Sequence, residues 1–114
     1  MSDVRQQGLL ACEPLNGSTR GLRLIVELDL ATVRYLKDAC EGIPAGEGQV
    51  TLDLSELTFV DSTGLHALLL YARENDGDGP VIFANPSTFV LRVMQITELD
   101  THPALEIRMD GDGR

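Results

Sequence analysis

Apolar residues in this chain follow two alternating spacings, and this alternation restricts the possible folds more than any other feature. Apolar side chains at every second position are typical of strands, and a spacing of three or four marks one face of a helix. The two patterns follow one another in the order β-β-α-β-α-β-α-β. Strand-helix-strand repeats favour parallel pairing through right-handed crossovers, whereas the first two strands favour a hairpin. The sequence predicts an α/β fold with a single layer of mixed β-sheet and helices mainly on one face.

Turn and cap residues separate the expected elements. Asn16-Gly17 is a strong turn signal between the first two strands, and Ser87 is a candidate N-cap. A possible extension of the third strand through residues 58–60 stays open. Strands are expected over residues 9–13, 22–28, 50–54, 81–84 and 105–109. Helices are expected over residues 31–41, over 61–75, and after Ser87, where Phe89, Val90, Val93 and Met94 form an apolar stripe.

Length and charge limit the class of protein. The 114 residues fit one domain, residues 1–114, with a core over 9–109 and short disordered termini. The formal net charge of −9 argues against direct nucleic-acid binding and against an anionic membrane surface, and it suits a partner with a basic face. The apolar run at residues 67–70 is far shorter than the roughly 20 residues of a membrane span, so no membrane insertion is expected.

The two cysteines and the beginning of the sequence point to a cytoplasmic protein. Cys12 and Cys40 form no CxxC motif, although a bridge between them stays possible from sequence. No apolar signal-peptide core is seen near residue 1. We therefore expect reduced thiols in the cytoplasm.

Residues 60–65, Val-Asp-Ser-Thr-Gly-Leu, lie where a strand should give way to a helix. A helix start has unpaired N–H groups and a partial positive charge, so it accepts a phosphate readily. Ser62 should be exposed there to another protein's active site, and Gly64 would allow close approach to the backbone. Phosphorylation adds roughly −1.5 to −2 charges, enough to break an interface without moving the fold. The alternative is that Asp-Ser-Thr is a plain helix N-cap.

Three segments, taken together, resemble the STAS domain of anti-anti-sigma factors. The segment Asp61-Ser62-Thr63-Gly64-Leu65 is similar to that family's motif after an apolar strand. Glu27-Leu28-Asp29 resembles the Glu-Leu-Asp at the end of the family's second long strand. Residues 85–97, from Asn-Pro-Ser to Ile-Thr, resemble its third-helix segment. The resemblance covers roughly residues 9–109.

This resemblance implies a regulatory protein without enzymatic activity or cofactor. In that family, the serine directly after the aspartate is phosphorylated by an anti-sigma factor that is itself an ATP-dependent serine kinase. The unphosphorylated antagonist binds this kinase and frees the sigma factor, the phosphorylated form is released, and a protein phosphatase resets it. The resemblance makes Ser62 the phosphorylation site. It implies a partner-binding surface made of Asp29, Asp61, Ser62, Thr63 and Gly64.

Two positions depart from the family pattern. The family usually has glycine before Glu-Leu-Asp, where this chain has Val26. It often has Thr-Gly-Leu after the third helix, where this chain has Thr97-Glu98-Leu99.

Other functions remain as alternatives. The main one is a non-phosphorylated STAS binding subunit of a transporter or lipid-trafficking complex. A hydrolase using Ser62 would need a base and an oxyanion site, and only His66, one helical turn away, is a candidate base. A phospho-aspartate at Asp53 would need an acidic pair and a late lysine, but the sole lysine is Lys37. His66 and His102 fit no metal-binding motif, so no metal site is expected.

Overall fold

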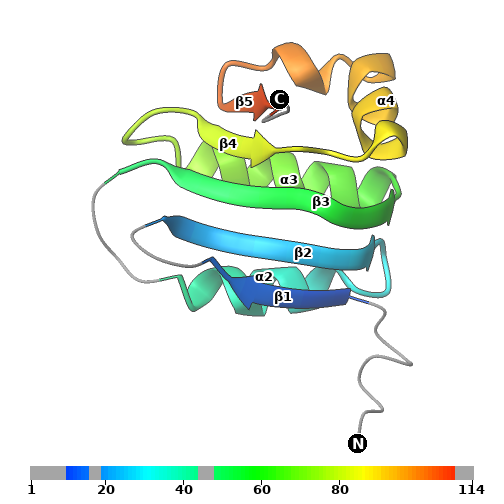
Figure 1. Cartoon of the computed structure of the whole chain (residues 1–114), viewed down its shortest axis with the longest axis horizontal. Helices are drawn as coiled ribbons and strands as arrows, with labels where there is room; N and C mark the ends of the chain where they lie inside the picture. The colour runs from blue at the N-terminus through cyan, green and yellow to red at the C-terminus, as the bar shows by residue number, and fades with distance from the viewer. Residues whose placement is uncertain (1–9, 16–18, 44–47, 110–114) are drawn as a thin grey trace, which may run out of the picture.

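The computed structural model describes residues 10–15, 19–43 and 48–109. The predicted Asn16-Gly17 turn and the predicted disordered termini lie outside these residues. Figure 1 shows the arrangement of the elements. In chain order they are β1 (Leu10–Pro14), β2 (Arg20–Leu28), α2 (Val33–Glu41), β3 (Val50–Val60), α3 (Ser62–Glu74), β4 (Val81–Ala84), α4 (Thr88–Ile96), the 3₁₀ helix η1 (Leu99–Thr101) and β5 (Leu105–Arg108).

The strands form one five-stranded sheet in which spatial order equals chain order, β1-β2-β3-β4-β5. β1 pairs with β2 antiparallel, and the other three pairs are parallel. In Figure 1, α2 and α3 lie behind the sheet, and α4 follows the end of β4. The predicted mixed α/β sheet is confirmed, and the C-terminal ends of β2, β3 and β4 lie at one end of the molecule.

The core lies between the sheet and the helices. Leu52 and Leu54, alternate residues of β3, are fully buried, whereas Asp53 between them is partly exposed. Leu36 of α2 and Leu68 of α3 are buried against this face. Every residue of β4 is buried, as its uninterrupted apolar sequence predicts. The elements that carry the candidate site are therefore anchored by an apolar core.

Three details differ from the sequence-based expectation. β3 continues to Val60, so residues 58–60 do extend the strand. α2 begins at Val33 and not at residue 31, because the Asp29 carboxylate accepts hydrogen bonds from the backbone N–H groups of Ala31 and Thr32 and holds them in a turn. The apolar spacing does not predict η1.

The expectation that Phe89 belongs to the apolar stripe of α4 is wrong. Its side chain is 46% exposed, and Val90 and Met94 fill the buried positions of the helix. The ring of Phe89 instead stacks on that of Phe59 at the end of β3. A contact between residues so far apart in sequence leaves no periodic signal.

The two departures from the family pattern fall where the backbone is left-handed. Val26 has a φ of 82° and Glu98 a φ of 63°. Glycine adopts such angles without steric cost, whereas residues with a Cβ are disfavoured. Val26 lies at a register shift between β2 and β3, and Glu98 follows the C-cap of α4. At both places this chain therefore carries a residue with a Cβ in a backbone conformation that favours glycine.

No helix in the described part of the chain is both long and apolar enough to cross a bilayer.

Candidate functional site

Asp61 is the residue that caps α3. Its backbone is extended, with φ −103° and ψ −176°, and its Oδ1 accepts a hydrogen bond of 2.8 Å from the backbone N–H of Gly64. The backbone N–H of Asp61 donates to the carbonyl of Leu28 at the end of β2. One orphan donor of the helix start is therefore satisfied by the aspartate and not by the serine that follows it.

The second carboxylate oxygen of Asp61 connects two loops. Oδ2 accepts a hydrogen bond of 3.1 Å from the backbone N–H of Leu30, in the loop between β2 and α2. Asp61 thus fixes the beginning of α3 relative to this neighbouring loop. Its carboxylate has a structural role in addition to any contact with a partner.

Asp29 organises the same loop from the inside. Its Oδ1 accepts hydrogen bonds from the N–H groups of Ala31, at 3.0 Å, and Thr32, at 3.1 Å. The Thr32 hydroxyl lies within hydrogen-bond distance of the Glu27 carbonyl and accepts from the N–H of Asp29. Thr32 is 1% exposed, so the loop is anchored in the interior. The structure brings Asp29 and Asp61 into one connected site through Leu30.

Ser62 is the first residue of α3, and its side chain is exposed. Its hydroxyl makes no hydrogen bond to any residue that the structure describes. The N-cap of α3 is therefore Asp61. The Ser62 hydroxyl stays accessible at the positive end of the helix dipole. Thr63 lies beside it and is half-buried.

Gly64 is explained by the chain's own packing. It is buried, and a Cβ at this position would lie 2.5 Å from the carbonyl oxygen of Leu28. The beginning of α3 can approach the end of β2 only because this residue lacks a side chain. The sequence-based interpretation was that Gly64 leaves room for an approaching molecule. The structure instead explains this glycine by the close packing of α3 against β2. A part for Gly64 in partner binding stays a prediction.

Three of the exposed large apolar side chains lie where β2 and β3 end and where α4 begins. They are Leu30, 72% exposed, Phe59, 39% exposed, and Phe89, 46% exposed. The two rings stack with centroids 5.7 Å apart and an angle of 18° between their planes. Sequence reasoning missed all three as surface residues. Of the three, only the exposure of Phe59 could have been predicted, because strand alternation places Phe59 on the face opposite the buried Val60.

Within the described residues, no base is hydrogen-bonded to the Ser62 hydroxyl. His66 is exposed, and no hydrogen bond joins it to Ser62 within the described part of the chain. Burial raises the pKa of Cys12 to about 11 and that of Cys40 to about 12, and both thiols are free. These thiols are therefore protonated near neutral pH and are poor nucleophiles. Among the described residues, no cluster of three or more His, Cys, Asp or Glu could hold a metal ion.

The mixed sheet, with a serine at the start of the helix that follows its central strand, defines a domain of the STAS type. The chain belongs to the STAS domain family, because the family model described as the MlaB STAS domain matches residues 13–108. No curated protein matches the sequence.

Solved structures that share the fold include the following two. The anti-sigma factor antagonist SpoIIAA in its unphosphorylated form is 24% identical, with a TM-score of 0.57 over 90% of this chain and 89% of that one. An uncharacterised DUF3478 protein with a SpoIIAA-like fold, from Shewanella loihica PV-4, is 13% identical, with a TM-score of 0.52 over 92% of this chain and 88% of that one. At these identities the likeness is one of fold.

Proposed function

We propose that this chain is a cytoplasmic anti-sigma factor antagonist that regulates transcription by partner switching and is not itself an enzyme. Unphosphorylated, it binds an anti-sigma factor that is also a serine kinase. Phosphorylation of Ser62 releases it, and a protein phosphatase restores the binding form. The observation that supports this most is the exposed Ser62 hydroxyl, which is left unengaged because Asp61 already caps α3.

The electrostatics of the helix start favour a phosphate on Ser62. The phosphate would lie at the N-terminus of α3, where the helix dipole and free N–H groups favour negative charge. The antagonist SpoIIAA, with which this chain shares its fold, was solved in its unphosphorylated form. A phosphorylated form of this chain, modified at Ser62, is proposed here by analogy.

Release follows from the cost of covering the phosphate. An added charge of roughly −1.5 to −2 must be desolvated when a partner binds over it. The carboxylate of Asp61, next to Ser62, would add repulsion to any acidic group that the partner presents. The chain itself tolerates the phosphate, because Ser62 is exposed and takes no part in the cap.

Intact-mass analysis of the protein purified from its own cells tests the proposal. We expect a phosphorylated fraction whose phosphate maps to Ser62 by fragmentation, and its loss in the Ser62→Ala variant. Fragmentation must separate Ser62 from the adjacent Thr63. A protein that carries no phosphate under growth and stress conditions, while still binding its partner, would contradict the proposal.

The second candidate function is a STAS binding subunit of a transporter or lipid-trafficking complex that is not phosphorylated. The matching family model is that of the MlaB STAS domain, whereas the likeness to the antagonist rests on fold. The match to the MlaB family model is therefore the reason for keeping the binding-subunit function as a second candidate. The same mass analysis separates the two functions, since only the first requires a phosphate on Ser62.

A further inference from the structure

We propose that Leu30, Phe59 and Phe89 form an apolar strip that is the main contact surface for the partner. The strip would take a protein segment whose apolar residues are flanked by Lys or Arg. This inference rests on the proposed function, in that the partner is the protein released when Ser62 is phosphorylated. It extends the partner-binding surface away from the serine, across the end of β3 and on to α4.

Each of the three residues is linked to the segment from Phe59 to Ser62. The N–H of Leu30 donates to the carboxylate of Asp61, the residue directly before Ser62. Phe59 lies three residues before Ser62, a separation that even an extended chain limits to about 10 Å. Phe89 stacks on Phe59. Leu30 and the stacked Phe59–Phe89 pair therefore flank the turn at Asp61 and Ser62, and the pair continues on to α4.

Both ends of the strip are held in an exposed position by the fold. Leu30 is 72% exposed, although Asp29 and Asp61 fix the backbone around it through hydrogen bonds. The Ser87 hydroxyl donates to the carbonyl of Leu57, which ties the beginning of α4 to β3 and keeps Phe89 beside Phe59. Single exposed apolar residues are ordinary, but exposed apolar side chains that gather at one end of the sheet mark an interaction site. A rigid group also loses little entropy when a partner binds.

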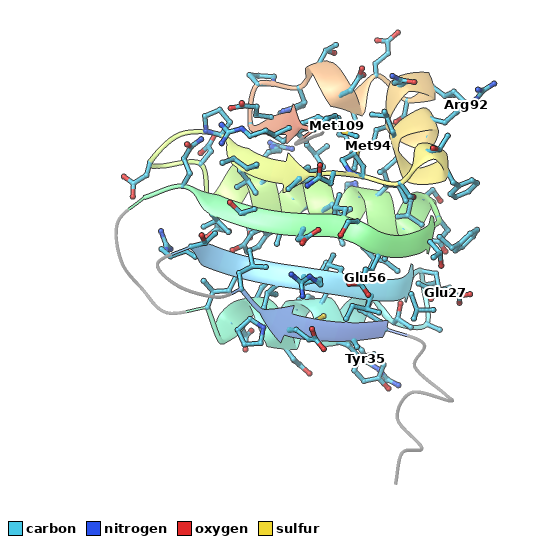
Figure 2. The ribbon with its side chains drawn as sticks, in the orientation of Figure 1. Glu27, Tyr35, Glu56, Arg92, Met94 and Met109 are labelled. Carbon is cyan, nitrogen blue, oxygen red and sulfur yellow. The ribbon has the colours of Figure 1, made fainter. Side chains whose placement is uncertain are left out.

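The charges around the strip indicate the chemistry of the partner. Glu27 is the register partner of Phe59, and Asp29 directly precedes Leu30. Asp61 accepts a hydrogen bond from the Leu30 N–H, and the whole chain carries a formal net charge of −9. Figure 2 shows Glu27 and Arg92 at the same end of the molecule, with Arg92 on α4. Anionic nucleic acid and anionic lipid are both repelled by this surface. A protein with an apolar centre and a basic rim is complementary to it.

Site-specific photo-cross-linking tests the strip in the full-length protein in its own cells. p-Benzoylphenylalanine replaces Leu30, Phe89, Thr63 or Leu70, one position at a time, and the captured proteins are identified by mass spectrometry. Leu70 is the matched control, because it is an exposed leucine, at 39%, that lies eight residues further along α3 in the groove between α2 and α3. Thr63 reports on the surface around the phosphorylation site.

We expect positions 30, 63 and 89 to capture the same protein through a segment in which Lys or Arg flank apolar residues, and position 70 not to capture it. In a titration with that protein, Leu30→Ala should weaken binding at least about tenfold, whereas Leu70→Ala should leave it unchanged. Thermal melts of both variants show whether they are folded.

Each other outcome decides between the two proposals. Capture at position 63 alone overturns the strip and leaves the proposed function standing. Capture at 30 and 89 that persists unchanged in a Ser62→Asp background supports the strip and counts against phosphorylation as the switch. A captured second copy of this chain, an acidic segment, equal capture at position 70, or no capture at any position would each overturn the strip.

Discussion

Glu98 has a left-handed backbone conformation that residues with a Cβ rarely adopt. It follows the C-cap of α4 with a φ of 63° and a ψ of 16°. A left-handed conformation costs a residue with a Cβ roughly 1–2 kcal/mol, and helices commonly end with glycine at this position. The family that this chain resembles often has glycine there. Nothing that the structure describes binds the Glu98 side chain in compensation.

We predict that Glu98→Gly raises the free energy of unfolding by about 1 kcal/mol. The gain comes from removing the left-handed strain, and it should appear as a higher urea midpoint at unchanged slope. Glu74→Gly is the control, because Glu74 lies within α3 and glycine should lower the stability there by up to about 1 kcal/mol. Equal effects of the two substitutions would show that Glu98 is not strained.

Asp61 and Ser62 are adjacent but should respond very differently to truncation. Asp61→Ala removes the cap on Gly64 and the acceptor of the Leu30 N–H, so we expect a loss of about 1–2 kcal/mol in the free energy of unfolding. Ser62→Ala removes an exposed hydroxyl without a partner among the described residues, so the change should stay within about 0.5 kcal/mol. Urea unfolding of both variants measures the difference. A similar loss in both would mean that the serine shares the cap.

At the scale of elements, Arg23 and Asp53 connect β2 and β3. They are register partners in the parallel pair, and the Arg23 Nε lies 3.2 Å from Asp53 Oδ2. Burial by itself raises the pKa of Asp53, but hydrogen bonds from Ser55 and the charge of Arg23 outweigh it, and the pKa is lowered overall. A carboxyl group whose pKa is lower in the folded state stabilises the fold while it is ionised.

We predict that Asp53→Asn lowers the free energy of unfolding near neutral pH, by less than about 1 kcal/mol because the pair is near the surface. The contribution of the carboxylate is present above the unfolded pKa of about 3.9 and is lost as the pH falls through the lower folded pKa. The two proteins should therefore converge in acid, which urea unfolding from about pH 7 down to about pH 3 measures.

Glu106→Gln is the control for this prediction. It removes the more exposed ion pair with Arg108 within β5, whose side chains are 44% and 47% exposed. We expect almost no change in stability from it. A difference for Asp53→Asn that grew as the pH fell would contradict the stabilising role of the carboxylate.

The elements were predictable from the sequence where periodicity alone decides them. The strands, the helices and the Ser87 cap follow from local spacing, and Ser87 does accept a hydrogen bond from the N–H of Val90. The position of Ser62 at a helix start was also predictable. Which of Asp61 and Ser62 caps the helix was not, because it depends on the extended backbone of Asp61. The pairing of Phe59 with Phe89 depends on where α4 packs, which no local pattern records.

At the scale of the whole molecule, phosphorylation should act on the partner and leave the fold unchanged. We predict that Ser62→Asp weakens binding of the cognate kinase while the melting temperature barely changes. A negative group at a helix N-terminus is locally favourable by about 0.3–1 kcal/mol, whereas a partner must desolvate it. Calorimetric titration beside a thermal melt measures both effects.

Thr101→Asp is the matched control, because it adds the same charge on an exposed residue of η1. We expect it to leave binding unchanged. Unchanged affinity in Ser62→Asp would remove Ser62 from the interface. A large fall in its melting temperature would instead show that the charge acts through the fold.

The length of α3 keeps the turn at its C-terminal end far from Ser62, so a fluorescent reporter can be inserted in that turn. Its thirteen residues separate Ser62 from the turn after Glu74 by about 20 Å. In that turn Gly77 is exposed, and a Cβ there would meet no atom within 4 Å. A fluorescent reporter inserted at Gly77 should therefore leave the kinase affinity unchanged, whereas the same fusion carrying Ser62→Asp should bind the kinase more weakly. The fusion at Gly77 would make partner exchange visible in living cells, and its Ser62→Asp version would supply the baseline for weakened binding.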